Sequence, residues 1–313
     1  MACWDHPENP LIPPMDLVQI ISDPTIVVPE DSPDGLWHLF ASTDFRLTHW
    51  VSEDGIHWKN VKNYFWLNHT QWIFKEGNKY YLFYQVKRFP SGWINVRISE
   101  DLYNWSKPKK VLWATLKWEK RQIGGVVRNP CVVKVDSKYY LYYSGGIQFF
   151  RDLGWGEPKH IGLAISDNIL GPYEKLKDPI ISPDKNHPYR NEGCGGLRVY
   201  RWFGSYFIGF ENGVYRDKDR KVHSAILLLV SKDGIKWHDV TPLILPSDGW
   251  KKVFVWQLDA IPRGDEIWIY YNARNGWIRG IEQIGLTICK KEYIKNLVEN
   301  KLREIEESKE PIR

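Results

Sequence analysis

The sequence of 313 residues has few cysteines and no long apolar run. Its four cysteines lie far apart, without a C-x-x-C pair, at Cys3, Cys131, Cys194 and Cys289. This spacing argues against a zinc site or a dithiol redox site, so we expect mostly buried thiols. The longest unbroken apolar stretch covers residues 225–230, whereas about 20 apolar residues are needed to cross a bilayer. We therefore expect no membrane partner.

Excess charge of either sign is also scarce. The chain carries 43 Lys and Arg against 38 Asp and Glu, a net charge of +5, and its basic residues are scattered along the sequence. Nucleic-acid binding requires a basic stripe or patch, so we expect no nucleic-acid partner. Residues 1–14 contain no apolar segment of the kind found in secretory signals, which favours a cytoplasmic location. Nothing in the sequence indicates an oligomeric state.

Aromatic residues are abundant, with 17 Trp, 17 Tyr and 12 Phe, and many of them repeat at a regular interval. Five similar aromatic segments recur about every 58 residues and together account for most of the chain. Each ends in a small or polar residue. The five segments are Trp37–Ser42, Tyr80–Gln85, Tyr139–Ser144, Tyr206–Glu211 and Ile267–Asn272.

A second recurring element follows the first four aromatic segments and contains Asp-Gly or a related turn signal. Asp-Gly is typical of tight turns between antiparallel strands, because Gly accepts a positive φ and Asp bonds its own backbone. The fifth repeat lacks this element. Its four copies begin at Ser52, Ser99, Ser166 and Ser231.

These repeats predict an all-β fold, a five-bladed β-propeller with four strands in each blade. Helical spacing of apolar residues occurs only near the end of the chain, from Ile294 to Ile305. We therefore divide the chain into a propeller catalytic domain over 1–289 and a C-terminal helical tail over 290–313. The aromatic excess is expected to fill the space between blades, with a minority lining a ligand site.

Polar and acidic residues begin the predicted innermost strands, where the side chains of a propeller point into the mouth of its channel. Asp23 begins the first blade and Glu192 the fourth. Two carboxylates that face each other across a channel suit glycoside hydrolysis, in which one protonates the leaving oxygen and the other activates water or attacks carbon. Asp23 and Glu192 are therefore the candidate catalytic pair.

The sequence resembles glycoside hydrolase family 43 and its five-bladed relatives over about residues 9–289. The resemblance rests on Asn9-Pro10-Leu11-Ile12, Ser22-Asp23-Pro24-Thr25, the Asn-Pro step before Tyr139, and Glu192-Gly193 before Tyr206. It implies an inverting glycosidase acting on arabinofuranosides or β-xylosides, with Asp23 as base and Glu192 as acid. The Asn-Asp-Pro-Asn segment of the retaining fructan-cleaving relatives is absent, which also favours inversion.

One position departs from the family pattern. Where the resemblance implies an aspartate that tunes the acid, this chain has Asn129, within Arg128-Asn129-Pro130. An amide supplies no negative charge to raise the pKa of the acid. Three interpretations follow: a more acidic activity profile, a substitute carboxylate such as Asp259 or Glu211, or a chain that binds sugar without cleaving it.

Other residues near the predicted channel are candidates for substrate binding. Trp72 and Trp93 are expected to stack on sugar rings, and Arg128 to contact Asn129 or substrate. His69 and His223 are candidates to orient water or a channel calcium, but we expect no metal site and no required cofactor. The side chains expected to bond sugar hydroxyls are Gln71, Gln257 and Arg274.

The sequence favours an exo-acting glycosidase that releases a pentose or furanose unit from oligosaccharides. A glycoside phosphorylase on the same scaffold is an alternative, and it requires basic residues and a histidine beside a single acid. A non-catalytic sugar-binding propeller is another, although its blades would repeat one pocket. Sialidases share similar Asp turns but have six blades. Selectivity is expected in residues 149–159 and 215–222, which show no readable pattern.

Overall fold

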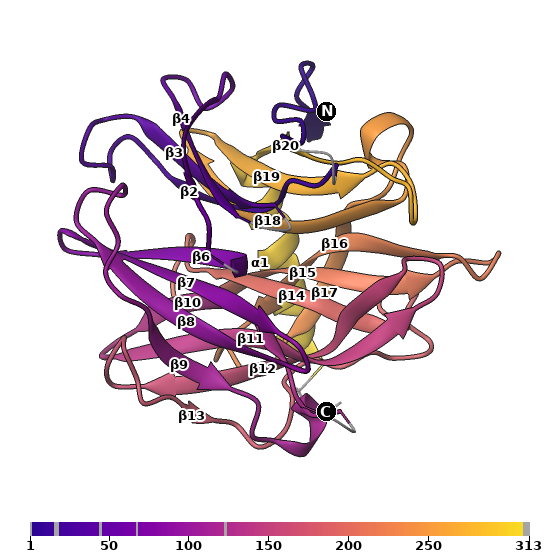
Figure 1. Cartoon of the computed structure of the whole chain (residues 1–313). Coiled ribbons are helices and arrows are strands. Elements are labelled where there is room, and N and C mark those ends of the chain that lie inside the picture. Colours follow the sequence, from indigo (N-terminus) through magenta and orange to yellow (C-terminus); the bar gives the residue numbers. More distant parts are fainter. Residues whose placement is uncertain (1, 16–18, 44–45, 67, 122–123, 309–313) are drawn as a thin grey trace.

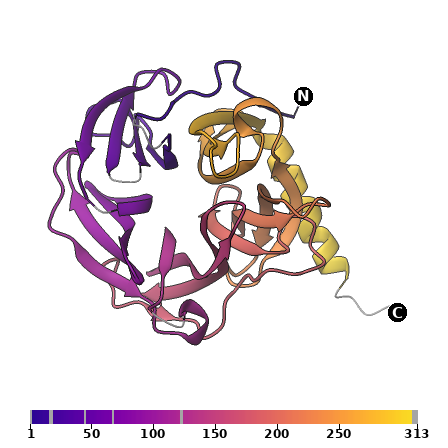
Figure 2. The same cartoon turned by 45° about the vertical axis from the view of Figure 1, so that its right-hand side comes forward.

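The computed structural model describes residues 2–15, 19–43, 46–66, 68–121 and 124–308. Five four-stranded antiparallel sheets are arranged radially around a central axis (Figures 1 and 2). The predicted five-bladed β-propeller is confirmed. The blades contain, from the inner to the outer strand, β2 (Ser22–Val27), β3 (Trp37–Ser42), β4 (Leu47–Ser52) and β5 (Lys59–Tyr64); β6 (Asn68–Glu76), β7 (Lys79–Arg88), β8 (Ser91–Ser99) and β9 (Lys109–Trp113); β10 (Val127–Val135), β11 (Lys138–Phe150), β12 (Trp155–Ser166) and β13 (Glu174–Lys175); β14 (Gly193–Tyr200), β15 (Phe207–Arg216), β16 (Val222–Ser231) and β17 (His238–Ile244); and β18 (Phe254–Arg263), β19 (Glu266–Arg274), β20 (Glu282–Lys290) and β1 (Cys3–Asp5).

The five aromatic segments form the second strand of each blade, and their side chains fill the spaces between neighbouring blades. The Trp37 ring of blade one stacks on Trp268 of blade five at 5.8 Å between ring centroids. Buried apolar clusters likewise join blade one to blade five and blade two to blades three and four. The expected role of the aromatic excess in packing is therefore confirmed, because hydrophobic burial here holds separate sheets together.

The Asp-Gly turns connect the third and fourth strands and dock against tyrosines of the adjoining blade. Gly55 has φ +79° and Gly234 has φ +74°, a conformation that favours glycine. The Tyr270 hydroxyl donates to the Gly55 carbonyl oxygen at 2.9 Å, and Tyr142 does the same to Gly234. A Cβ on either glycine would meet that hydroxyl at under 3 Å. Glycine therefore serves both the turn and the contact between blades.

The fifth blade takes its outer strand from the other end of the chain. β1 pairs with β20, and Cys3 lies opposite Cys289. This pairing explains why the fifth repeat lacks an Asp-Gly turn, because no fourth strand follows β20 in the sequence. Cys3 and Cys289 form a disulfide, which corrects the expectation of a thiol at both positions, whereas Cys131 and Cys194 are buried free thiols as expected. Disulfides persist mainly in oxidising compartments, so the cytoplasmic location gains no support and stays a prediction.

The disulfide fastens the strand that closes the ring, across a sequence separation of 286 residues. Replacing both Cys3 and Cys289 by Ser is expected to lower the free energy of unfolding by about 2–5 kcal/mol. Denaturant unfolding of the wild type with and without dithiothreitol measures the same loss. The double variant serves as the control, since the reductant should not change it further. An unchanged unfolding midpoint of the reduced wild type would contradict this role.

A buried cation closes the channel beneath the candidate site. Arg198 on β14 is fully buried and donates to backbone carbonyl oxygens of three other inner strands, at Gln71, Pro130 and Leu258. Asp259 on β18 completes this network by accepting hydrogen bonds from the backbone N of Ile26 and the hydroxyl of Tyr200. The inner strands of all five blades are thus joined through two charged side chains.

A pair of buried histidines lies where blade one packs against blade two. His38 Nε2 is 2.8 Å from Asp34 Oδ1, and His38 Nδ1 is 2.8 Å from His49 Nε2. His49 Nδ1 is buried and has no hydrogen-bond partner in the described part of the chain. Burial, helped by the neighbouring His38 and Lys62, lowers the pKa of His49 to about 3, against an Asp34 charge that raises it. Burial also lowers the pKa of His38.

This pair makes stability depend on pH. The unfolded chain binds a proton at His49 near pH 6.5, whereas the folded chain does so only near pH 3, so stability is lost as the pH falls between these values. We expect the free energy of unfolding to fall from about pH 6.5 downward by at most about 1.4 kcal/mol per pH unit for this proton. His49→Gln, whose amide reaches the position of Nε2, should reduce this slope in urea unfolding. His57→Gln, at an exposed histidine, is the control, and equal slopes in all three proteins would disprove the assignment.

The predicted C-terminal helix is present as α1 (Lys291–Glu307). Ile294 and Val298 are buried against the apolar cluster of blades four and five, which explains the helical spacing of apolar residues. α1 crosses the outside of these blades in Figure 2. None of the described helices is long and apolar enough to cross a membrane.

Candidate active site

A β-bulge near the beginning of every inner strand positions the candidate residues. In blades one, three, four and five, two inner-strand residues lie opposite one residue of the second strand, and blade two has one extra residue at Thr70. Bulges of this kind redirect side chains at the ends of strands. Asp23 has φ 56° and Asn129 has φ 54°, values that are uncommon outside glycine and often occur at functional sites. The four two-residue bulges are Asp23-Pro24, Asn129-Pro130, Gly195-Gly196 and Trp256-Gln257.

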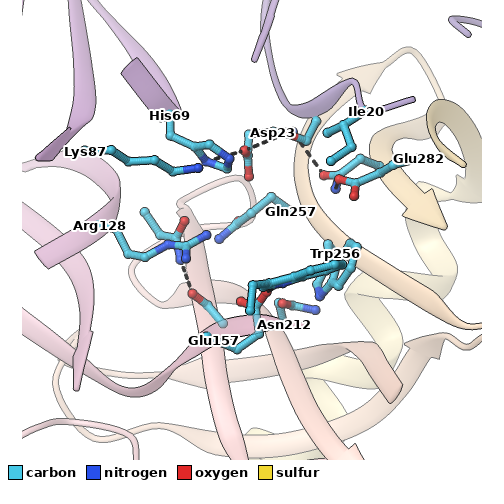
Figure 3. A pocket seen from close by; sticks show the side chains of 16 residues that line it. Ile20, Asp23, His69, Lys87, Arg128, Glu157, Asn212, Trp256, Gln257 and Glu282 are labelled. Carbon is cyan, nitrogen blue, oxygen red and sulfur yellow. Dashed lines mark hydrogen bonds and ion pairs between the residues drawn. The ribbon is translucent and has the colours of Figure 1, made fainter. Parts of the chain in front are cut away.

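These bulges surround one cavity of about 390 Å³ at the mouth of the channel. Figure 3 shows side chains from all five blades converging on it. Asp23, Arg128, Asn129 and Gln257, four of the residues predicted from the sequence, are part of its lining. The remaining lining residues are Ile20, Ser22, His69, Lys87, Trp155, Gly156, Glu157, Gly195, Asn212, Trp256, Asn272 and Glu282.

Asp23 is a buried carboxylate held in its ionised form. Burial alone would raise its pKa, but His69, the charge of Arg128 and the Ser22 hydroxyl together lower it to about 2. His69 Nδ1 is 3.2 Å from Asp23 Oδ2, and Ser22 Oγ donates to the same oxygen at 3.0 Å. Burial and the charge of Lys87 lower the pKa of His69 to about 4, so this imidazole is neutral at pH 7. Asp23 is therefore a charged acceptor at the edge of the cavity.

Two glutamates in the same cavity have the opposite tendency. Burial raises the pKa of Glu282 to about 8, and the charge of Asp23 adds to this effect while Arg274 opposes it. Burial also raises the pKa of Glu157, against the opposing charge of Arg128. Carboxyl groups whose pKa values are driven apart by their environments are typical of acid and base partners in catalysis. The cavity thus holds an ionised aspartate and glutamates that favour the protonated state.

The two glutamates occupy different sides relative to Asp23. Asn272 Oδ1 accepts a hydrogen bond from the backbone N of Asp23 at 3.1 Å, and Asn272 Nδ2 donates to Glu282 Oε1 at 2.6 Å. Glu282 therefore lies on the Asp23 side of the cavity. Glu157 comes from β12 of blade three, where it accepts a hydrogen bond from Trp155 Nε1 at 2.7 Å. Figure 3 shows Glu157 on the side opposite Asp23.

Asn129 occupies in blade three the bulge position that Asp23 occupies in blade one. Its Nδ2 donates to Ser144 Oγ at 2.7 Å and to the Gly195 carbonyl oxygen. Its Oδ1 is buried and has no hydrogen-bond partner among the described residues. The amide is thus fixed by two acceptors and presents an unused acceptor of its own, which suits a ligand hydroxyl better than the tuning of an acid.

The expectation that Glu192 faces Asp23 across the channel is corrected. Glu192 precedes β14, and the bulge of blade four begins only after Cys194, at Gly195. Glu192 instead lies in a neighbouring depression, where Gln148 Nε2 donates to it at 2.7 Å and Arg216 Nε is 3.2 Å away. At Gly195 itself a Cβ would collide with the side chain of Asn212. Blade four therefore contributes glycine where an acid was expected.

Several residues predicted to bind substrate have structural roles instead. Gln71 is fully buried and its amide donates to the Asp23 carbonyl oxygen, so it supports the first blade's bulge from below. Trp72 is buried, donates to the Val132 carbonyl oxygen and faces Arg198. Trp93 lies in a separate depression beside Trp113 and Lys110. These three side chains point away from the cavity because the bulge exposes only one or two residues of each inner strand.

The proposed substitute carboxylates also lie outside the cavity lining. Glu211 is fully buried and forms an ion pair with Arg190, with 2.5 Å between Arg190 Nη1 and Glu211 Oε2. Asp259 belongs to the Arg198 network of the channel floor. Arg274 donates to backbone carbonyl oxygens of the 276–278 turn and lies 3.6 Å from Glu282, so it acts on the site through that glutamate. His223 contacts the Val253 carbonyl oxygen and Asp217, away from the cavity.

Sequence reasoning missed both glutamates of the cavity. Glu157 lies on the long β11–β12 hairpin, in a segment that showed no pattern, and Glu282 begins an outer strand. Asn212 and Asn272 were also missed, although each is the single second-strand residue opposite a bulge. The polar ending of each aromatic segment was the available signal for Asn272. In the described part of the chain, no three His, Cys, Asp or Glu side chains gather as a metal site would require.

Comparisons with known proteins agree with this architecture. Residues 65–187 match the model of the glycosyl hydrolases family 43. No curated protein sequence matches the chain. Among solved structures, the catalytic domain of the glycoside hydrolase family 62 α-L-arabinofuranosidase of Coprinopsis cinerea is similar, with 16% identity, a TM-score of 0.63, and coverage of 90% of this chain and 95% of that one.

Two further solved structures have the same fold. The β-1,2-mannobiose phosphorylase of Listeria innocua is 13% identical with a TM-score of 0.66, and 96% of this chain and 99% of that chain are covered. A glycosyl hydrolase of Bacteroides ovatus is 14% identical with a TM-score of 0.64, and the coverage is 92% and 93%. At these identities the structures establish the fold, while the matched family model indicates the enzyme class. The chain is therefore a glycoside hydrolase family 43-like five-bladed β-propeller and an enzyme of the glycosyl hydrolase class.

Proposed function

We propose that the cavity at the channel mouth hydrolyses the terminal glycosidic bond of an oligosaccharide by single displacement, with release of a pentose or furanose unit. The observation that carries this proposal is the contrast between Asp23, whose pKa is lowered to about 2, and two glutamates in the same cavity whose pKa values are raised. At neutral pH the cavity contains both a base and an acid. This is the pair of states that inverting hydrolysis requires.

In this proposal Asp23 is the general base. It removes a proton from a water molecule, whose oxygen attacks the anomeric carbon. His69 and Ser22 hold the Asp23 carboxylate, and Asn272 fixes its backbone. A neutral His69 orients the carboxylate without neutralising it, because its own pKa lies near 4. The base is thus positioned by three neighbouring side chains.

Glu157 is the general acid of the proposal, in place of Glu192. A single displacement requires acid and base on opposite sides of the sugar, with carboxyl groups about 6.5–9.5 Å apart. Glu157 lies across the cavity from Asp23, whereas Glu282 shares Asn272 with it (Figure 3). The neighbouring Pro158 carbonyl oxygen is next to Gly193 at the beginning of β14. Glu157 therefore reaches the place in blade four where the family resemblance implies an acid.

The walls of the cavity suit a single sugar unit. Trp155 and Trp256 line it with ring centroids 6.0 Å apart, and Trp256 also stacks on Phe254 at 4.5 Å. Indole faces bind the apolar faces of sugars. Asn129 Oδ1, Trp256 Nε1 and Gln257 Nε2 are buried without hydrogen-bond partners in the described chain, so they remain available to sugar hydroxyls. One asymmetric cavity of this kind favours an exo-acting enzyme over a binding protein with repeated pockets.

Hydrolysis of a panel of nitrophenyl glycosides tests the proposal. The panel includes the α-L-arabinofuranoside, β-D-xyloside and β-D-galactofuranoside and is run with wild type and Asp23→Asn, with and without phosphate. We expect the wild type to release nitrophenol from at least one pentoside or furanoside without phosphate, and the variant to release none. Turnover only with phosphate would replace hydrolysis by phosphorolysis. No turnover under any condition would contradict the proposal.

A further inference from the structure

Two basic side chains line one side of the cavity and have no place in the hydrolytic steps. Lys87 extends from the end of β7 and Arg128 from the beginning of β10, beside His69. In Figure 3 both side chains extend from the side of blades two and three toward the cavity. Arg128 Nε is buried and has no hydrogen-bond partner among the described residues. A guanidinium with a buried, unused donor aimed at a cavity is suited to an oxygen acceptor of a ligand.

The charges of the cavity make these cations unusual for a site that cleaves neutral sugars. At neutral pH Asp23 is ionised, His69 is neutral and Glu282 is mostly protonated, while Lys87 and Arg128 are cationic. The transition state of glycoside cleavage resembles an oxocarbenium ion and is itself positive. Cations beyond those that balance Asp23 oppose this charge, unless the ligand brings an anion to face them.

Two depressions near the cavity have the same character. One adjoins Glu157 through Lys159, has a volume of about 600 Å³, and contains Glu192 as its acidic residue. The other has a volume of about 460 Å³ and shares Arg216 with the first. Both lie at the ends of the β11–β12 and β15–β16 hairpins. The basic side chains that line them are Lys159, His160, Lys185 and Arg216 in the first, and Arg151, Arg216, Arg220 and Lys221 in the second.

We propose that Lys87 and Arg128 form an oxyanion subsite within the cavity, which holds either the carboxylate of a uronosyl unit or free phosphate. This inference rests on the proposed function and specifies the chemical class of its ligand. An Arg guanidinium binds planar or tetrahedral oxyanions through paired N–H donors, and the Lys87 ammonium adds a second charge. The basic depressions extend the same preference to an acidic oligosaccharide that continues beyond the cavity.

The two sources of the oxyanion lead to different balanced reactions. With a uronosyl substrate, water attacks the anomeric carbon and gives its proton to Asp23, while the departing oxygen takes a proton from Glu157. With phosphate, a phosphate oxygen attacks the anomeric carbon in place of water, the same bond to the departing oxygen breaks, and that oxygen again takes the proton of Glu157. The products are a free uronic acid in the first case and a glycosyl phosphate in the second.

Binding calorimetry at low and high salt tests the subsite without requiring turnover. The probes are inorganic phosphate, D-glucuronate, D-galacturonate and D-mannuronate, each uronate paired with its neutral sugar. We expect at least one anion to bind the wild type about 10-fold or more tightly than the neutral sugars, and less tightly at high salt. Arg128→Gln and Lys87→Gln should each weaken that binding by about 10- to 100-fold. Arg88→Gln, on the same hairpin but outside the cavity lining, should bind like wild type.

Each result has a defined meaning. If uronate binds and the matching nitrophenyl uronide is hydrolysed, the ligand is a uronosyl unit; if phosphate binds and turnover depends on it, the ligand is phosphate. Anion binding without any turnover would support the subsite while contradicting the proposed function. Turnover of neutral glycosides with no preference for any anion would overturn the subsite and leave the proposed function in place. Because Lys87 is exposed, Lys87→Gln is readable even if Arg128→Gln does not fold.

Discussion

Glu157→Gln is expected to lower kcat for a natural oligosaccharide by about 10²- to 10⁴-fold, the usual contribution of a general acid. The amide keeps the hydrogen bond from Trp155 Nε1 but has no proton to give to the departing oxygen. A nitrophenyl leaving group needs little protonation, so its hydrolysis should be affected far less. Steady-state kinetics with both kinds of substrate measure the difference.

Glu192→Gln is the matched control for this experiment. Glu192 is a glutamate from the adjoining depression, paired with Arg216 and outside the cavity lining. We expect its kcat on natural substrates to stay within a few-fold of wild type. If Glu192→Gln lost the activity and Glu157→Gln retained it, the assignment of the acid made from the structure would be wrong, and the assignment implied by the sequence resemblance would be restored.

The pH profile provides an independent readout of the same role. A general acid acts in its protonated form, so activity declines as the pH rises through its pKa, which burial raises at Glu157. Asp23 acts in its ionised form, and activity declines only as the pH falls toward about 2. With activated substrates, Glu157→Gln should therefore flatten the alkaline limb of the profile. An alkaline limb identical to that of wild type would assign that limb to another group, with Glu282 the first to examine.

Asp23→Asn is expected to lower kcat by about 10²- to 10⁴-fold on every substrate. Water must be deprotonated whatever the leaving group, so activated nitrophenyl glycosides should not be spared. This uniform loss distinguishes the base from the acid. Kinetics on the two substrate types, with the melting temperature as a check of folding, measure the effect.

Asp31→Asn is a suitable control for Asp23→Asn. Asp31 is a carboxylate of the same blade that pairs with Lys75 on the surface, at 2.8 Å between Asp31 Oδ1 and Lys75 Nζ. Surface ion pairs contribute little to stability, so this variant should retain both fold and activity. If the Asp23→Asn enzyme kept activity on nitrophenyl glycosides and lost it on natural linkages, Asp23 would be acting as the acid.

The blade architecture could be predicted from the sequence because it depends on local and repeated signals. Each aromatic segment and each Asp-Gly turn carries its structure in a few neighbouring residues, and Trp37–Ser42 coincides with β3. The closure of the ring could not be predicted in this way. Pairing of Cys3 with Cys289 joins the two ends of the repeat array, and no local pattern encodes that contact.

The same distinction explains which part of the cavity was found. Asp23, Asn129 and Gln257 occupy bulges of inner strands, a position that the repeat identifies in every blade. Glu192 failed because the resemblance fixes a motif but not the bulge register, which in blade four begins at Gly195. Glu157 reaches the cavity from an outer strand of blade three, through the length of the β11–β12 hairpin. Its place depends on tertiary packing rather than on any spacing in the sequence.

Identification of the first-formed anomer by proton nuclear magnetic resonance tests single displacement between Asp23 and Glu157 most directly. The wild-type enzyme is mixed with its best substrate from the glycoside panel, and spectra are recorded before the released sugar mutarotates. The account predicts that the first product has the anomeric configuration opposite to that of the substrate. A first product of retained configuration would contradict it, because retention requires a covalent intermediate on a carboxylate only about 5–5.5 Å from the acid.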